Sequence, residues 1–274
     1  LPSSIGSFSE VVFVVEDDLW RGSIKEIVAE TFGAPIEGLY NNEANFRILQ
    51  LNYSEFKLFK KHPNIVIIAK DVKPSSQKNK WAKEQMVIQL NYKKEDLKHD
   101  LNKIKASFEF KESRSIKNKI STRSQQLPQQ NIYQNFKIKI LIPSEYTIIN
   151  DSSTFFLATY NPEEQEVIKH LLVFSFTPKA ISSRQEVLQK IDSIFAQYLP
   201  GDIQGQYVKI EPEFPPYYIN NICKGRWKLE NGFMGGLLLV KTYFVDKKIV
   251  VSAGLVFDPL SAERNYLKTF EAIL

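Results

Sequence analysis

The distribution of hydrophobic positions predicts strands and helices along the whole chain. Two unbroken apolar runs, VVFVV (11–15) and NIVIIA (64–69), have the length of buried strands. In the stretch 97–108, apolar residues recur every three or four positions, which predicts an amphipathic helix. The segment FKIKILI (136–142) alternates polar and apolar residues, as strands with one solvated face do. No apolar run approaches the roughly 18 residues of a membrane-spanning helix.

The same pattern predicts two α+β subdomains. Residues 1–120 form the first, and residues 136–274 form the second. Residues 121–135 are polar and contain a proline, so we expect a linker there. Short turns join several adjacent strands, which favours mainly antiparallel sheets with helices packed on one face. We expect the first subdomain to resemble a split βαβ sandwich.

Local signals predict where several elements begin or turn. Helix caps are expected at Asp17 or Asp18, at Ser182-Ser183 before Glu186, and at Asp258, which is followed by Pro259 in the first helical position. A hairpin turn is expected at Asp246-Lys247.

The positive charge of the chain does not point to a nucleic acid. The net charge is +5, but 29 of the 36 basic residues are lysine, and phosphate or base recognition favours the planar arginine fork. Residues 93–124 hold ten basic and five acidic residues, which equals the excess of the whole chain. We therefore interpret the charge as the solvated face of one basic helix and expect no nucleic-acid partner.

The residue types that perform catalysis show no recognised arrangement. The histidines His62, His99 and His170 do not have zinc-site spacing, and we expect neither a metal nor a cofactor. Cys223 is the single cysteine and has no histidine near it in sequence, which favours a buried inert thiol over a catalytic thiolate.

Two acidic clusters could supply a carboxylate pair for glycoside cleavage. They are Glu16-Asp17-Asp18 and Glu163-Glu164-Glu166. Helix capping accounts for the first and a solvated hairpin turn for the second, so we assign no catalytic residue.

The glycine-rich stretch GRWKLENGFMGG (225–236) has two interpretations, a ligand loop or a turn between strands. Asn231-Gly232 is a strong tight-turn dipeptide, because both residues tolerate positive φ. Gly235-Gly236 leads into the apolar run LLLV, whereas a phosphate loop needs a following helix with free amides. We therefore expect a turn, followed by a bulge or a close backbone crossing.

Residues in this stretch are also our main candidates for binding a partner. Alternation places Trp227 on one strand face and Arg226 on the other. The turn lifts Phe233 and Met234, which we expect to fold onto the sheet edge, since an exposed pair risks association. Aromatic side chains and arginine dominate interfaces. The candidate binding residues are Trp20, Arg226, Trp227, Phe233 and Met234.

Four stretches resemble a family of Bacteroidota envelope lipoproteins catalogued as a domain of unknown function. They are LWRGSIKEIV (19–28), YLPGDIQGQY (198–207), GRWKLENGFMGG (225–236) and ERNYLKTFEAIL (263–274). The family pattern is RGLW followed by FMGG; this chain has GRW in place of RGLW, and GGLLLV where GGPF is usual. The resemblance runs from about residue 8 to the end of the chain and supplies no catalytic residues.

The resemblance implies a location and a function. It implies a lipoprotein signal and a lipidated cysteine ahead of Leu1, and hence an outer-membrane lipoprotein of the cell envelope. We expect a non-catalytic component that binds another envelope protein in an outer-membrane or cell-wall assembly. The alternative is an envelope hydrolase or carbohydrate-binding domain acting on peptidoglycan or glycan. Two carboxyl groups facing each other in an aromatic-lined cleft would favour that alternative.

Overall fold

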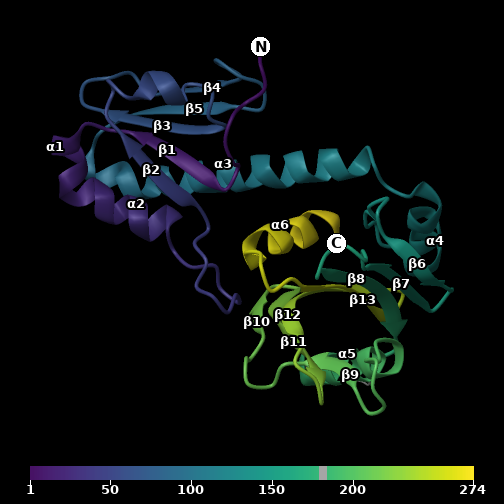
Figure 1. Cartoon of the computed structure of the whole chain (residues 1–274). Coiled ribbons are helices and arrows are strands. Elements are labelled where there is room, and N and C mark those ends of the chain that lie inside the picture. Colours follow the sequence, from purple (N-terminus) through teal and green to yellow (C-terminus); the bar gives the residue numbers. More distant parts are fainter. Residues whose placement is uncertain (179–183) are drawn as a thin grey trace. The chain divides into compact units, whose positions relative to one another are not determined.

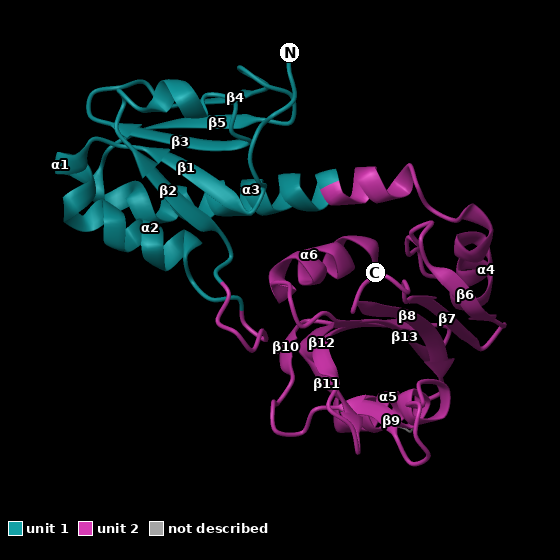
Figure 2. Ribbon diagram, viewed as in Figure 1, with its two compact units in different colours: residues 1–36, 44–115 teal, residues 37–43, 116–274 magenta. Residues whose placement is uncertain are grey.

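The computed structural model describes residues 1–178 and 184–274, which form two compact units (Figure 2). Unit 1 comprises residues 1–36 and 44–115, and unit 2 comprises residues 37–43 and 116–274. Both units combine a sheet with helices, so the predicted α+β class is confirmed.

The sheet of unit 1 is mixed rather than mainly antiparallel. Its strand order is β2-β1-β3-β5-β4, and β4 joins antiparallel to a sheet whose other pairings are parallel (Figure 1). The continuous apolar runs of β1 and β3 are typical of parallel strands buried on both faces, and this signal outweighs the short connections. The strands are β1 (Glu10–Val14), β2 (Arg47–Leu51), β3 (Asn64–Ala69), β4 (Ser75–Lys78) and β5 (Met86–Asn91).

Helical segments cover both faces of this sheet. On one face, α2 (Lys25–Phe32) and α3 (Lys94–Ser121) share a core with alternate residues of β1 and β3. On the other, the 3-10 helix η2 (Phe56–Phe59) packs with the remaining strand residues and Trp81. The predicted apolar stripe of α3 is buried in the first of these cores.

The helix predicted after β1 is interrupted. A short α1 (Asp17–Leu19) runs into a π-type turn η1 (Trp20–Ile24), in which Gly22 leaves helical geometry. Glu16 occupies the N-cap position without a side-chain cap, so the predicted cap at Asp17 or Asp18 is wrong. Asp17 instead accepts a hydrogen bond from the Gln50 side chain.

The sheet of unit 2 has eight strands, and every pairing in it is antiparallel. Seven strands follow the order β10-β11-β12-β13-β8-β7-β6, and the eighth, β9, pairs with β11. Two of its long strands, β12 and β13, flank the predicted hairpin turn Asp246-Lys247. The strands are β6 (Thr147–Asp151), β7 (Phe155–Tyr160), β8 (Ile168–Phe176), β9 (Tyr207–Ile210), β10 (Tyr217–Ile219), β11 (Ile222–Glu230), β12 (Gly235–Val245) and β13 (Lys248–Phe257).

Helices lie on both faces of this sheet, not on one as expected. On one face, α5 (Arg184–Tyr198) shares a core with Leu238 and Val240 of β12. On the other face lies α6 (Glu263–Ile273) (Figure 1). Its Phe270 packs against Gly254 of β13. The apolar run at the start of β12 explains the difference, because consecutive buried residues need cover on both sides.

The expected linker at residues 121–135 contains a helix instead. Helix α4 (Gln126–Phe136) buries Ile132 and Phe136, which are four positions apart. Pro128 lies in its first turn, where a missing N–H costs nothing. The polar composition of the segment concealed this short amphipathic helix.

Two further predictions around the ends of elements differ from the structure. Residues 136–142 alternate in burial as predicted but form no strand; there the Leu141 amide bonds to the Ile273 carbonyl. Helix α6 begins at Glu263, so Asp258 is not its cap. The turn at Asp246-Lys247 is present, with positive φ at both residues. The predicted cap Ser182-Ser183 lies outside the described residues.

Candidate functional site

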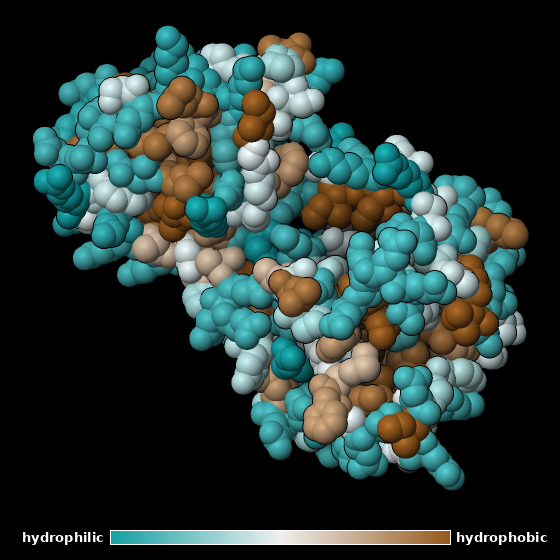
Figure 3. Space-filling model, in the orientation of Figure 1, coloured by the Kyte–Doolittle hydropathy of each residue, from teal (hydrophilic) through white to brown (hydrophobic). Residues whose placement is uncertain are grey.

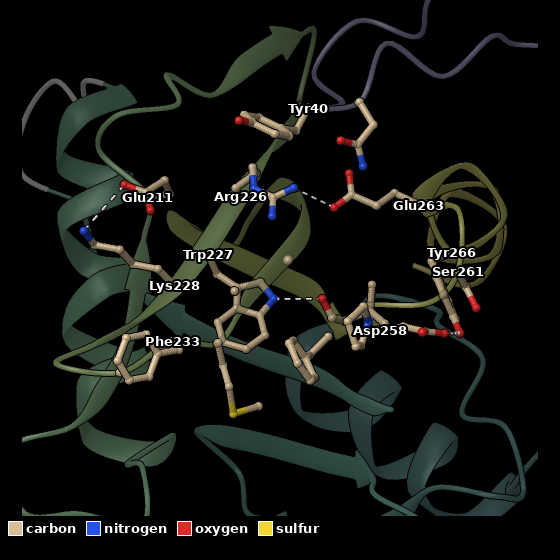
Figure 4. Close-up of a pocket in the computed structure, with 18 residues that line it drawn as sticks. Tyr40, Glu211, Arg226, Trp227, Lys228, Phe233, Asp258, Ser261, Glu263 and Tyr266 are labelled. Atoms are coloured by element: carbon tan, nitrogen blue, oxygen red, sulfur yellow. Dashed lines mark hydrogen bonds and ion pairs between the residues drawn. The ribbon is translucent and has the colours of Figure 1, made fainter. Parts of the chain in front are cut away.

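The glycine-rich stretch forms one wall of a pocket of about 500 Å³ in unit 2 (Figure 4). We call it the hairpin pocket. The other walls come from the end of β13, the loop leading into α6, the start of α6, and the loop 37–43. The site therefore assembles segments that are far apart in the chain.

The glycines of the hairpin serve the backbone. The positive φ of the turn lies at Asn231, and the Gly232 amide donates to the Leu229 carbonyl. A Cβ on Gly235 would lie 2.8 Å from the Trp227 carbonyl oxygen, and one on Gly236 would collide with the Val256 carbonyl oxygen. Glycine at both positions lets β12 approach β11 and β13 closely.

Arg226 is held in the pocket by two partners. Its Nη1 atom lies 2.7 Å from Glu263 Oε1 in an ion pair, and both side chains are largely buried. The guanidinium also lies over the Tyr40 ring, 4.9 Å from its centroid. Figure 4 shows Arg226 between these two partners, so a planar cation is fixed by an acid and an aromatic face.

The loop 37–43 is tied to α6 by a carboxylate. The two oxygens of Glu43 accept hydrogen bonds from the backbone amides of Glu263 and Arg264, each at 2.8 Å. These amides belong to the first turn of α6, where a negative charge is favourable. Glu43 therefore supplies the cap that Asp258 was expected to supply, and it fixes Tyr40 beside Arg226.

Two acidic groups of the pocket are shifted in opposite directions. Burial raises the pKa of Glu263, and the neighbouring Arg226 opposes this only in part. Burial also acts to raise the pKa of Asp258, but hydrogen bonds from Tyr266, Ser261 and the Leu260 amide lower it below its ordinary value. The Tyr266 hydroxyl donates to Asp258 at 2.6 Å, and burial together with this bond raises the pKa of Tyr266 to about 12.

The remaining charged groups complete a pocket that carries both signs. Lys228 Nζ lies 3.6 Å from Glu211 Oε1 on the side formed by β11. Pairs of this kind, partly open to solvent, can exchange partners with an incoming ligand at little cost. The pocket thus offers cations, anions and aromatic rings together to a ligand or a partner surface.

The structure separates the predicted binding residues. Arg226 and Trp227 both line the hairpin pocket, but Trp227 is 3% exposed and its indole N–H donates to the Val256 carbonyl, so it is a wall of the pocket. Trp20 packs in the core of unit 1, with its ring 6.2 Å from that of Phe13.

Phe233 and Met234 have opposite environments, although both were expected at the sheet edge. Phe233 is fully exposed at the turn, so that expectation is wrong for this residue. Met234 packs on the core below the sheet. The four-residue connection between β11 and β12 leaves room for one of the two side chains to turn inward.

Exposed apolar side chains also occur around the mouth of the pocket. Tyr40 and Phe233 line it, and Leu260, between the lining residues Pro259 and Ser261, is 89% exposed. Figure 3 shows apolar side chains reaching the surface among hydrophilic ones in unit 2. Exposed apolar groups rimmed by polar ones are typical of interaction sites.

Sequence reasoning missed several residues of the pocket. Each lies in a segment with a separate local explanation, such as a loop or a helix start. The hairpin pattern carried no information about which distant segments face it. The missed lining residues are Tyr40, Glu211, Asp258, Glu263 and Tyr266, and Glu43, which caps α6, was missed as well.

The other candidate groups are buried or dispersed. Burial raises the pKa of Cys223 to about 11, which keeps the thiol protonated and fits the inert interpretation. Burial lowers the pKa of His62 and of His170. The acidic clusters at 16–18 and 163–166 belong to different units. Within the described residues, no group of three or more potential ligands could hold a metal ion.

Among the helices of the described residues, none combines the length and the apolar character needed to cross a bilayer.

Comparison with known families gives two adjoining matches. Residues 125–274 match the family described as Domain of unknown function (DUF4837), and residues 4–129 match Domain of unknown function (DUF8532). The first match covers more than half of the chain, so the chain belongs to the DUF4837 family. Membership of a family of unknown function agrees with the resemblance noted in the sequence. No curated protein matches the chain.

Proposed function

We propose that this member of the DUF4837 family is a non-catalytic binding protein of the cell envelope, anchored by an N-terminal lipid, that captures a partner protein at the hairpin pocket. The observation that carries the proposal is the fully exposed Phe233 at the rim of that pocket. The envelope location and the lipid anchor rest on the sequence resemblance alone.

Phe233 has the properties of an interface anchor. Its backbone is fixed by the Asn231 turn and by the bond from the Leu229 amide to the Met234 carbonyl. Covering a Phe side chain is worth about 1.5–3 kcal/mol, and a preordered turn loses little entropy on binding. Tyr40, which is 61% exposed, adds a second exposed aromatic ring to the lining of the same pocket.

The ion pairs of the pocket give such an interface its specificity. Arg226 and Lys228 both lie in β11, and each pairs with a carboxylate from another segment, Glu263 or Glu211. A partner must carry complementary charges, because a like charge placed opposite one of these groups reduces the binding free energy by roughly several kcal/mol.

The proposal is tested by purifying the native full-length protein with its neighbours after mild cross-linking in the cells that make it. Phe233→Ser should reduce recovery of the specific partner at least about tenfold, since central aromatic anchors are worth 2 kcal/mol or more. Phe244→Ser is the matched control, because Phe244 is 74% exposed at the other end of β12, near the Asp246-Lys247 turn between β12 and β13. Equal recovery with both variants would contradict the proposal.

A second candidate function is binding or hydrolysis of an envelope glycan. The observation that favours it is the presence, in one aromatic-lined pocket, of one carboxyl group with a raised pKa, Glu263, and one with a lowered pKa, Asp258. Carbohydrate-cleaving sites use such a pair as acid and base. Binding of peptidoglycan fragments that is lost in Tyr40→Ala, or cleavage that is lost in Glu263→Gln, would favour this function over the first.

A further inference from the structure

A second pocket, of about 290 Å³, lies in unit 2 between the sheet and the segment that follows α5. Its deep wall consists of side chains that are at most 5% exposed: Leu157, Leu199, Val208 and Trp227. At its mouth Ile149 is 59% exposed, beside exposed polar residues. Pockets with apolar walls and few polar groups are the usual sites of small organic ligands.

One polar group in this pocket has an open hydrogen-bonding position. His170 Nδ1 lies 2.9 Å from Thr159 Oγ1, and Nε2 has no partner among the described residues. Burial lowers the pKa of His170 to about 4, so the ring is neutral at physiological pH. Depending on whether Nδ1 donates to or accepts from Thr159, Nε2 is an acceptor or a donor.

A hydroxyl group suits Nε2 in either state, because it both donates and accepts a hydrogen bond. A carboxylate suits it less well. It can only accept, and Asp202 lines the same pocket and would repel it. The volume is at the low end of the range for ligand sites, which fits one chain better than a two-chain lipid.

We propose that this second pocket binds a single alkyl chain bearing a neutral hydroxyl group, and that His170 Nε2 bonds to that hydroxyl. Alkyl burial against the apolar walls supplies the affinity, and the histidine fixes the orientation of the chain. The site is independent of the proposed function, although Trp227 and Met234 line both pockets.

The position of Trp227 allows a direct test. The chain has three tryptophans, and Trp20→Phe with Trp81→Phe leaves Trp227 as the single one, in the wall of the second pocket. In this otherwise complete protein, 10-bromodecan-1-ol should quench the fluorescence of Trp227 saturably, because bromine quenches indole on contact. Unbrominated 1-decanol should compete and restore the signal.

Variants of His170 then locate the binding. His170→Leu should weaken the alcohol about fivefold, the effect of one lost hydrogen bond, whereas His170→Gln should keep the affinity within about twofold. The pair keeps the test informative if the leucine variant is poorly folded by circular dichroism. With the unchanged histidine, 10-bromodecanoic acid should bind about tenfold more weakly than the alcohol, since its charge must be desolvated near Asp202.

Three results would overturn the proposal. The first is quenching without saturation, and the second is equal affinity for the acid and the alcohol. The third is weakening by Lys228→Gln but not by His170→Leu, which would place the alcohol in the hairpin pocket. If Phe233 proved to have no role in binding a partner protein, the alcohol site would be unaffected, because Phe233 lines the hairpin pocket and not the second pocket.

Discussion

Phe233 and Trp227 lie in one hairpin, yet one is fully exposed and the other is 3% exposed. Alternation along β11 correctly separated Trp227 from Arg226, because side chains of a strand point to opposite faces. It could not place Phe233, since the turn obeys no such period. At the scale of single residues, the sequence therefore predicted which strand residues share a face, and left the turn residues undetermined.

His170 gives a prediction at the same scale. Its folded pKa of about 4 lies below the ordinary value of 6.5, so the unfolded chain takes up a proton in this window while the folded protein does not. The unfolding free energy is therefore unaffected by His170 above pH 6.5, and it decreases as the pH falls from 6.5 towards 4. At pH 5 the loss should be about 2 kcal/mol, from about 1.4 kcal/mol per pH unit.

The measurement compares urea unfolding of the wild type and His170→Gln at pH 7.5 and pH 5. Carboxyl groups lower the unfolding free energy of both proteins equally, so their effect cancels in the difference. The unfolding free energy of His170→Gln relative to the wild type should therefore be higher at pH 5 than at pH 7.5. A difference that does not change with pH would mean that the imidazole titrates normally in the folded protein.

At the scale of elements, the apolar runs predicted the buried strands β1 and β3, but they did not predict how strands pair or which helices cover each sheet face. The run NIVIIA in β3 carries the signal of a parallel strand buried on both faces, but short connections suggested an antiparallel sheet. Residues 136–142 alternate as predicted, yet their amides bond to other segments, because strand pairing depends on partners that are distant in sequence. Helix α4 was hidden by its polar composition.

The hairpin of β11 and β12 depends on close backbone contact at Gly236. Gly236→Ala should destabilise the fold by about 2 kcal/mol or more, because the new methyl group collides with the Val256 carbonyl oxygen and forces β12 away from β13. Gly225→Ala in β11 is the matched control, since its Cβ would meet Pro216 at 3.4 Å, an ordinary contact. Thermal unfolding that affects both variants equally would contradict this role of Gly236.

The apolar stripe of α3 supplies a second test of an element. Leu101 is fully buried in the core of unit 1, so Leu101→Ala should cost about 2–5 kcal/mol of unfolding free energy. The neighbouring exposed Asn102 provides the control Asn102→Ala, which should change stability by less than about 0.5 kcal/mol. An unchanged midpoint for Leu101→Ala in urea would mean that the helix does not pack on the sheet in solution.

At the scale of the whole molecule, the site could not be predicted because it is assembled from distant segments. Most of the chain separates the loop 37–43 from the hairpin and from the start of α6, and Glu43 joins this loop to α6 through the α6 amides. The loop belongs to unit 2 although the residues on both sides of it belong to unit 1. No local pattern in the sequence indicates that the loop 37–43 leaves unit 1 and packs in unit 2.

The proposed envelope location makes a prediction for the native protein. The full-length precursor should carry a lipid-modified cysteine shortly before Leu1, so growth with an alkyne fatty-acid analogue should label it. More than one acyl chain is needed for stable anchoring, because a single chain binds membranes only marginally. A mature native protein that is released without label would contradict the anchor while leaving the hairpin pocket as a binding site.

The central claim is that the hairpin pocket receives a partner protein. Site-specific photo-cross-linking tests it most directly: a photoreactive phenylalanine derivative replaces Phe233 in the full-length protein, and Phe244 in a control, in the cells that make it. Both positions are exposed, so neither replacement disturbs the core. The account predicts a discrete cross-linked protein from position 233 and none from position 244. The same products from both positions, or no product from position 233, would contradict it.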